Sequence, residues 1–154
     1  MGIRKWKEKD IEAIVVIENQ SFTDPWQESL FKPLLKPPYT SIVFEEDNAV
    51  LGYAVLFDGV YDWELINIAV SPTHKKRGVG RALMKECINR AKKANADRLL
   101  LEVRPSNTAA VGLYRAFGFK DDGIRKGYMH QRTTLDSRED CFVKIKLLCC
   151  FFVS

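Results

Sequence analysis

A strand that runs into a basic, glycine-containing loop and then into a helix constrains this chain most. The apolar run 64–70 has the length of a strand, and apolar residues recur at helical spacing after residue 80. Between them, Gly78 and Gly80 let backbone N–H groups converge, and the helix start adds partial positive charge. Basic side chains crowd this point: Lys75, Lys76, Arg77 and Arg81. The arrangement predicts an anion site, and the pyrophosphate of a cofactor is its natural ligand.

The glycine spacing excludes two common phosphate loops. A Walker loop requires Gly-Lys-Ser/Thr after a four-residue gap, which this segment lacks. A dinucleotide fingerprint requires a third glycine, but Leu83 stands three residues after Gly80. The basic residue three positions before Gly78, which is Lys75, is therefore the more informative neighbour.

A second strand–loop–helix unit follows. Residues 98–104 have the composition of a buried strand, and residues 108–117 have helical spacing and end at Gly118. The pattern Lys75-x-x-Gly78-x-Gly80 resembles the acetyl-CoA loop of the GNAT N-acetyltransferases. The second unit is similar to the other half of that family's cofactor core, through Leu101, Glu102, Val103, Arg104, Asn107, Leu113, Tyr114, Phe117, Gly118 and Phe119.

Within this family, the sequence of residues 67–70 and 101–104 most resembles the RimI and Ard1 protein N-terminal acetyltransferases, which include ribosomal-protein alanine acetyltransferases. Residues 21–26 look like their substrate-side loop. The resemblance implies acetyl-CoA as cofactor and direct attack of an amine in a ternary complex. It further implies a protein N-terminus, such as that of a ribosomal protein, as acceptor.

The predicted fold is α/β: a GNAT fold with a central mixed, mostly antiparallel sheet of about six to seven strands and helices on both faces. Residues 1–154 are expected to form one domain, with the tail after about 148 left unassigned. Asp10 is expected to cap a first helix, and Asp24 a second one over 26–34. Strands are predicted at 3–6, 41–44, 50–57, 63–70, 98–104, 123–129 and 141–148, and further helices at 81–94 and 108–117.

Two residues are candidates for proton transfer, each with a structural alternative. Glu102 lies in an apolar strand, where burial would raise the pKa of its carboxyl group towards that of a general base; the alternative is a solvated carboxylate or a partner of Arg104. Tyr114 occupies the position of the family's general acid, which protonates the leaving thiolate. Its alternative is a core aromatic at helical spacing with Val111 and Phe117.

Cofactor binding is assigned to the loop, the preceding strand and Asn107. The resemblance implies that the backbone of Ile68, Ala69 and Val70 pairs with the pantetheine amides and stabilises the thioester oxyanion. Asn107 would bind the pantetheine arm, although it could instead cap the following helix. The complete predicted set is Ile68, Ala69, Val70, Lys75, Lys76, Arg77, Gly78, Val79, Gly80, Arg81, Asn107 and Tyr114.

The acceptor side is predicted at Phe22, Asp24, Trp26, Glu64 and Tyr128. The first three could instead form a hydrophobic loop anchor. Glu64 could equally be an exposed strand carboxylate, and Tyr128 a sheet aromatic. Relatives often have a second tyrosine after the position of Tyr128; this chain has Met129 and a longer segment, 131–138. Substrate choice is therefore expected to differ. Acetylation of a small amine or a lysine, and a non-catalytic acetyl-CoA-binding module, stay open as alternatives.

Composition limits the partners. A net charge of +4 suits an anionic cofactor, but the clustered basic and aromatic residues typical of nucleic-acid binding are missing. The cysteine and histidine spacing predicts no metal site. The apolar tail is too short to span a bilayer, and the charged residues 5–10 do not fit a signal peptide. We expect a cytoplasmic monomer or weak dimer.

Overall fold

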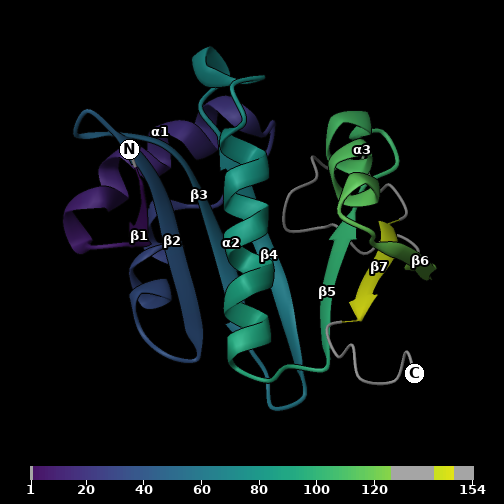
Figure 1. Cartoon of the computed structure of the whole chain (residues 1–154). Coiled ribbons are helices and arrows are strands. Elements are labelled where there is room, and N and C mark those ends of the chain that lie inside the picture. Colours follow the sequence, from purple (N-terminus) through teal and green to yellow (C-terminus); the bar gives the residue numbers. More distant parts are fainter. Residues whose placement is uncertain (1, 126–140, 148–154) are drawn as a thin grey trace.

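The computed structural model describes residues 2–125 and 141–147 (Figure 1). Its strands form one seven-stranded sheet in the order β1-β2-β3-β4-β5-β7-β6. The pairing is antiparallel everywhere except between β4 and β5, which run parallel. The predicted mixed, mostly antiparallel sheet is thus confirmed. The strands are β1 (Gly2–Lys5), β2 (Tyr39–Glu46), β3 (Ala49–Asp58), β4 (Asp62–Val70), β5 (Arg98–Val103), β6 (Lys120–Arg125) and β7 (Cys141–Leu147).

Helices cover both faces of the sheet. In Figure 1, α2 (Val79–Lys93) crosses in front of the sheet and α1 (Ile11–Ser21) lies behind it. The core beneath α2, which also receives α3 (Thr108–Ala116), is built on fully buried side chains such as Leu83 and Met84. A second core lies beneath α1, around Ile14. Each fully buried aliphatic side chain contributes about 1.5–3 kcal/mol of transfer free energy, so the sheet is fixed from both sides.

A β-bulge in β4 reverses the faces of its side chains. The β3–β4 ladder pairs Val55 with Asn67 but Leu56 with Leu65, so Ile66 is an extra residue. Before the bulge, Leu65 joins the core under α2; after it, Ile68 packs against that same core and Asn67 turns to the α1 side. An inserted residue exchanges the two faces of a strand because side chains alternate with period two.

β4 and β5 pair at only one end. Four residue pairs form their parallel ladder, from Asp62↔Arg98 to Leu65↔Leu101. The side chains of Asp62 and Arg98 reinforce this end through an ion pair with a 2.6 Å N–O separation. Beyond Leu65, β4 has no strand partner on this side in the described part of the chain. The sheet therefore splits where the bulge begins, and Figure 1 shows the two strands diverging.

Two local predictions are wrong. Asp10 stands at the start of α1 but does not cap it; its carboxylate accepts from the Lys7 backbone N–H at 2.7 Å and pairs with Arg4 at 2.8 Å. The Arg4 guanidinium holds the pKa of this carboxyl group below its usual range. No α-helix spans 26–34 either. Two short 3₁₀ turns replace it, Glu28–Leu30 and Lys32–Leu35, because Pro33 lacks the N–H that a continuous helix would need.

The remaining predicted elements are found within a few residues of their expected bounds, but residues 126–129 of the predicted strand 123–129 lie outside the described part of the chain. Further 3₁₀ turns occupy Glu8–Asp10 and Pro72–His74. The segment 131–138 and the tail after 148 lie outside the described residues. No helix in the described ranges has the length and apolar character needed to cross a membrane.

We predict that Gly52→Ala destabilises the fold by about 1–3 kcal/mol, because α2 packs directly on this strand residue. A Cβ atom at Gly52 would lie 2.9 Å from the Ala69 carbonyl oxygen and 3.0 Å from Cγ1 of Val79. Urea denaturation measures the change in unfolding free energy.

Gly112→Ala is the matched control. Gly112 lies inside α3, and a Cβ atom there meets no described atom within 4 Å. Alanine is the better helix former, so this variant is expected to gain about 1 kcal/mol. Equal stability of the two variants would show that α2 is not tightly packed on Gly52.

Candidate functional site

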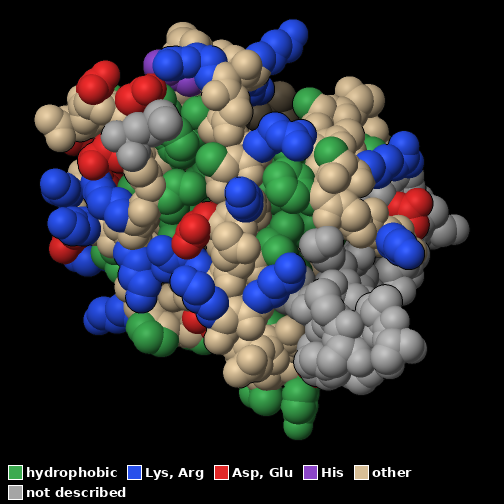
Figure 2. Space-filling model, in the orientation of Figure 1, with side chains coloured by type: hydrophobic (Ala, Val, Ile, Leu, Met, Phe, Trp, Pro, Cys, Tyr) green, Lys and Arg blue, Asp and Glu red, His purple; other side chains and the backbone are tan. Residues whose placement is uncertain are grey.

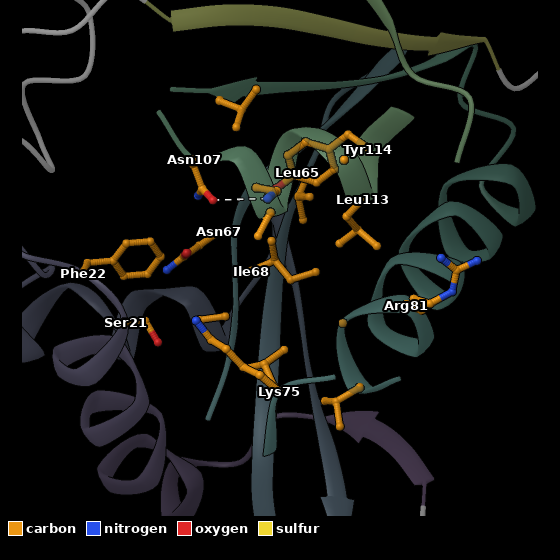
Figure 3. A pocket seen from close by; sticks show the side chains of 18 of the residues that line it. Ser21, Phe22, Leu65, Asn67, Ile68, Lys75, Arg81, Asn107, Leu113 and Tyr114 are labelled. Atoms are coloured by element: carbon orange, nitrogen blue, oxygen red, sulfur yellow. Dashed lines mark hydrogen bonds between the residues drawn. The ribbon is translucent and has the colours of Figure 1, made fainter. Parts of the chain in front are cut away.

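A cavity of about 830 Å³ opens where β4 and β5 diverge. Its walls come from five parts of the fold: the end of α1 with the next residues, the second half of β4, the start of α2, the end of β5, and α3. Figure 3 shows these elements converging on one space, with Phe22 and Asn67 on one side and Arg81 of α2 on the other. The cavity therefore joins both halves of the predicted site.

The basic loop, which the sequence predicts to bind an anion, lies at the start of α2. Gly78 precedes the helix with φ +85°, a left-handed conformation that favours glycine. This geometry lets the loop turn directly into the first helical turn, whose N–H groups have no intrahelical acceptor. Lys75, Lys76 and Arg81 line the cavity. These groups are the ones that an anion at a helix N-terminus requires.

Arg77 differs from the other predicted cations. Its guanidinium pairs with Glu46 at 3.3 Å, at the turn between β2 and β3, and it is not among the residues that line the cavity. Arg81 also packs over the ring of Phe117, with 5.3 Å from guanidinium carbon to ring centroid. Two of the four basic side chains, Arg77 and Arg81, thus interact with neighbouring side chains of the protein.

The two diverging strands form the long walls. Ile68, Ala69 and Val70 line one wall and Glu102 lines the other. Since the β4–β5 ladder ends at Leu65, the backbone of these β4 residues faces the cavity where another strand would otherwise pair. A ligand with its own amide groups can hydrogen-bond to such a strand edge.

Glu102 and Tyr114 both reach the cavity. Glu102 is half-buried and alternates along β5 with Leu101 and Val103, which point into the core. Tyr114 of α3 is 5% exposed, and its ring packs on Phe119 with 5.8 Å between centroids. A carboxylate and a phenol on facing elements of one cavity are suited to proton transfer.

Asn107 has one of its two predicted roles, that of a helix cap, and its binding of the pantetheine arm stays a prediction. Its Oδ1 accepts a hydrogen bond of 3.2 Å from the Ala110 backbone N–H, so it caps α3 (Figure 3). The same residue lines the cavity, as does Ser106 beside it.

The acceptor-side residues are only partly brought together. Phe22 lines the cavity, whereas Asp24 and Trp26 are not among its lining residues; the Trp26 ring packs on Phe31 at 5.8 Å between centroids. Glu64 lies before the bulge, between β3 and β5, and is also outside the lining. Tyr128 lies outside the described residues.

Three residues of this region were missed by sequence reasoning. Ser21 and Asn67 line the cavity, and the Ser21 hydroxyl is buried with no hydrogen-bond partner in the described structure. Glu18 is fully buried on α1 and bonds to Asn67. The available signal was the position of Glu18, four residues after Ile14 and seven after Ile11, on the helix face that these apolar residues mark as inward.

Comparison with known proteins identifies the family. The model of the "Acetyltransferase (GNAT) family" matches residues 8–119, well over half of the chain.

The chain belongs to the GNAT acetyltransferase family.

Several relatives and solved structures resemble the chain over most of its length. The ribosomal protein bS18-alanine N-acetyltransferase of Escherichia coli K12 is 33% identical over 134 residues, covering 87% of this chain and 88% of the relative. The crystal structure of the Escherichia coli ribosomal-protein-S18-alanine N-acetyltransferase superposes with a TM-score of 0.88 at 30% identity, covering 97% of this chain and 94% of that one. The yncA acetyltransferase of Salmonella typhimurium, solved with its cofactor acetyl-CoA, shares the fold at a TM-score of 0.78 and 22% identity, covering 96% and 94% of the two chains.

This GNAT protein is an N-acetyltransferase that uses acetyl-CoA. Its cavity fits that cofactor on two grounds. The N-terminus of α2 with its lysines suits a pyrophosphate, and the edge of β4 beyond Leu65 suits the amides of pantetheine.

We predict that Gly78→Ala weakens acetyl-CoA binding about tenfold, because a Cβ atom costs about 1–2 kcal/mol in the left-handed conformation that this loop requires. Titration calorimetry with CoA measures the dissociation constant. Arg77→Ala is the comparison variant, with an expected change below threefold, because Arg77 pairs with Glu46 outside the cavity lining. A larger loss for Arg77→Ala than for Gly78→Ala would contradict this reading of the loop.

Proposed function

We propose that this enzyme acetylates the N-terminal α-amine of a protein, with a ribosomal protein as the first acceptor to test. The observation that carries the proposal is the shape of the cavity. One space includes both the start of α2 and residues 21–23, at the end of α1 and just after it. Acetyl donor and peptide amine can therefore meet without a carrier residue. The substrate of the Escherichia coli relative, the alanine of bS18, supports the choice of acceptor.

The pKa of the acceptor amine favours an N-terminus. An α-amine has a pKa of about 7.7–8.0, so becoming neutral at pH 7 costs less than about 1.5 kcal/mol. A lysine side chain, at about 10.4, costs roughly 4.5 kcal/mol. Glu102 is only half-buried, and a single carboxylate acting through water suits the smaller of these demands.

We assign the proton transfers to the two groups on the cavity walls. Glu102 takes the proton of the attacking amine through a water molecule. Tyr114 gives its phenolic proton to the departing thiolate, a transfer that is uphill by roughly 2 kcal/mol from the reference pKa values of phenol and thiol. The backbone of Ile68–Val70 orients the pantetheine arm and donates hydrogen bonds to the thioester oxygen, where negative charge develops. Acetyl-CoA supplies an activated acyl group when bound.

Direct transfer agrees with the surroundings of Cys87. This cysteine is fully buried in the core face of α2, and burial raises the pKa of its thiol to about 12. A protonated thiol away from the cavity cannot act as an acyl carrier. The proposal therefore needs no covalent enzyme intermediate at this position.

A peptide panel tests the acceptor. Peptides that begin with Ala, Ser, Met, Thr or Gly are incubated with acetyl-CoA, beside N-blocked peptides that contain lysine, and mass spectrometry locates the acetyl group. We expect label on the free α-amine alone. Label on the blocked peptides would move the assignment to lysine. No label, together with tight CoA binding, would favour a small amine or a non-catalytic module.

We predict that Tyr114→Phe lowers kcat about 100-fold and leaves acetyl-CoA affinity within twofold, because the phenol acts only when the thiolate leaves. Phenylalanine keeps the packing on Phe119, so the fold should be retained. Tyr39→Phe is the control; Tyr39 packs on Phe57 in the β2–β3 pair, outside the cavity lining. An unchanged kcat in Tyr114→Phe would remove this residue from the reaction.

A further inference from the structure

One buried carboxylate ties together three parts of the acceptor side. Glu18 of α1 is 0% exposed. Its Oε1 accepts hydrogen bonds from the Tyr53 hydroxyl and, at 2.9 Å, from Nδ2 of Asn67. Its Oε2 accepts the backbone N–H of Trp26 at 2.8 Å. Asn67 Nδ2 also donates to the Tyr53 oxygen at 3.0 Å, which closes the cluster.

Apolar packing alone does not explain why a glutamate occupies this buried position. The inward residues that precede it on α1, Ile11, Ile14 and Ile17, are buried and apolar, and a buried carboxylate is unfavourable unless donors surround it. The protein supplies those donors from three separate segments. Such an arrangement fixes the geometry, since a carboxylate with several donors allows few positions for any of them.

The segments joined by Glu18 are those that shape the acceptor end of the cavity. Trp26 ends the loop that starts at Phe22, and Asn67 is the first residue after the bulge at Ile66. Ser21 lies one helical turn beyond Glu18 and places its unpartnered hydroxyl at the cavity. Moving the Glu18 carboxylate would therefore shift the acceptor loop relative to β4.

We propose that Glu18 is a positioning residue that sets peptide affinity without contributing to acetyl-CoA binding. Its hydrogen bonds hold the loop 22–26 at a fixed distance from the bulge of β4. The acceptor peptide then enters a groove of constant width, while the loop of α2 holds the cofactor independently. This inference rests on the acceptor site assigned above.

Glu18→Gln provides a sharp test because it keeps the volume and changes only hydrogen bonding. The glutamine oxygen can replace only one of the two carboxylate oxygens. The amide NH₂ then faces the donors of the other oxygen, either the Trp26 N–H or the Tyr53 and Asn67 groups. We expect the peptide KM to rise at least tenfold and the acetyl-CoA dissociation constant to stay within twofold. Hydrogen exchange at the Trp26 amide should become at least tenfold faster. Glu12→Gln, on the exposed face of α1, is the matched control and should change none of these.

Two further variants separate positioning from general stability. Tyr53→Phe keeps the aromatic packing on Trp6 and Phe31 but removes one donor, so it should shift the peptide KM in the same direction by less. If Glu18→Gln does not fold, Tyr53→Phe tests the proposal in its place. Ile14→Val loosens the same helix but removes none of the hydrogen-bonding groups, and its peptide KM should stay at the wild-type value.

Two results would overturn the proposal: an unchanged peptide KM and Trp26 exchange in Glu18→Gln, or an equal KM rise in Ile14→Val. If the wild-type enzyme acetylates no peptide, the proposed acceptor is wrong. The Trp26 exchange rate then decides separately whether Glu18 holds the loop.

Discussion

The partial pairing of β4 with β5 is the constraint on which the rest of this structure depends. Four residue pairs and the Asp62–Arg98 ion pair hold one end of the two strands together. The bulge at Ile66 then ends the ladder and redirects the side chains of β4. A continuous ladder would fill the space between the strands with backbone hydrogen bonds. By stopping it half-way, the fold opens a cavity in the middle of a sheet that is otherwise fully paired.

Each side of that opening is supported by a different kind of interaction. On the α2 side, close packing of Val79 and Leu83 on Gly52 fixes the helix whose N-terminus faces the cavity. On the α1 side, hydrogen bonds to Glu18 fix the loop instead. Apolar packing holds the basic end of the cavity, and a buried hydrogen-bonded cluster holds the loop at the other end. Under the proposed assignment, the donor half and the acceptor half of the site respond separately to substitution.

The sequence was most informative where the backbone itself makes the site. Glycine spacing, the basic residues and the strand–helix periodicity predicted the loop at residues 75–81 and the α/β sheet, and the assignment of the family followed from them. Tertiary pairing was beyond reach. Nothing in the local sequence shows that Arg77 pairs with Glu46, or that Asp10 pairs with Arg4 and leaves α1 uncapped. The bulge was equally hidden, because Asn67 and Ile68 read as ordinary alternating strand residues until the β3 register is known.

The unpaired side of β4 is also a strand edge placed inside a sheet. Exposed edges are liabilities, because any extended chain can pair with them and start aggregation. Here the edge lies at the bottom of a cavity, between β5 with α3 on one side and the end of α1 on the other. A long, flat partner strand cannot reach it, whereas a narrow molecule with a few amide groups can. The protein thus offers the recognition chemistry of an open β-strand inside a cavity rather than at an outer edge of the sheet. Figure 2 shows the molecule from the same side as Figure 1, with Lys and Arg side chains spread over this face.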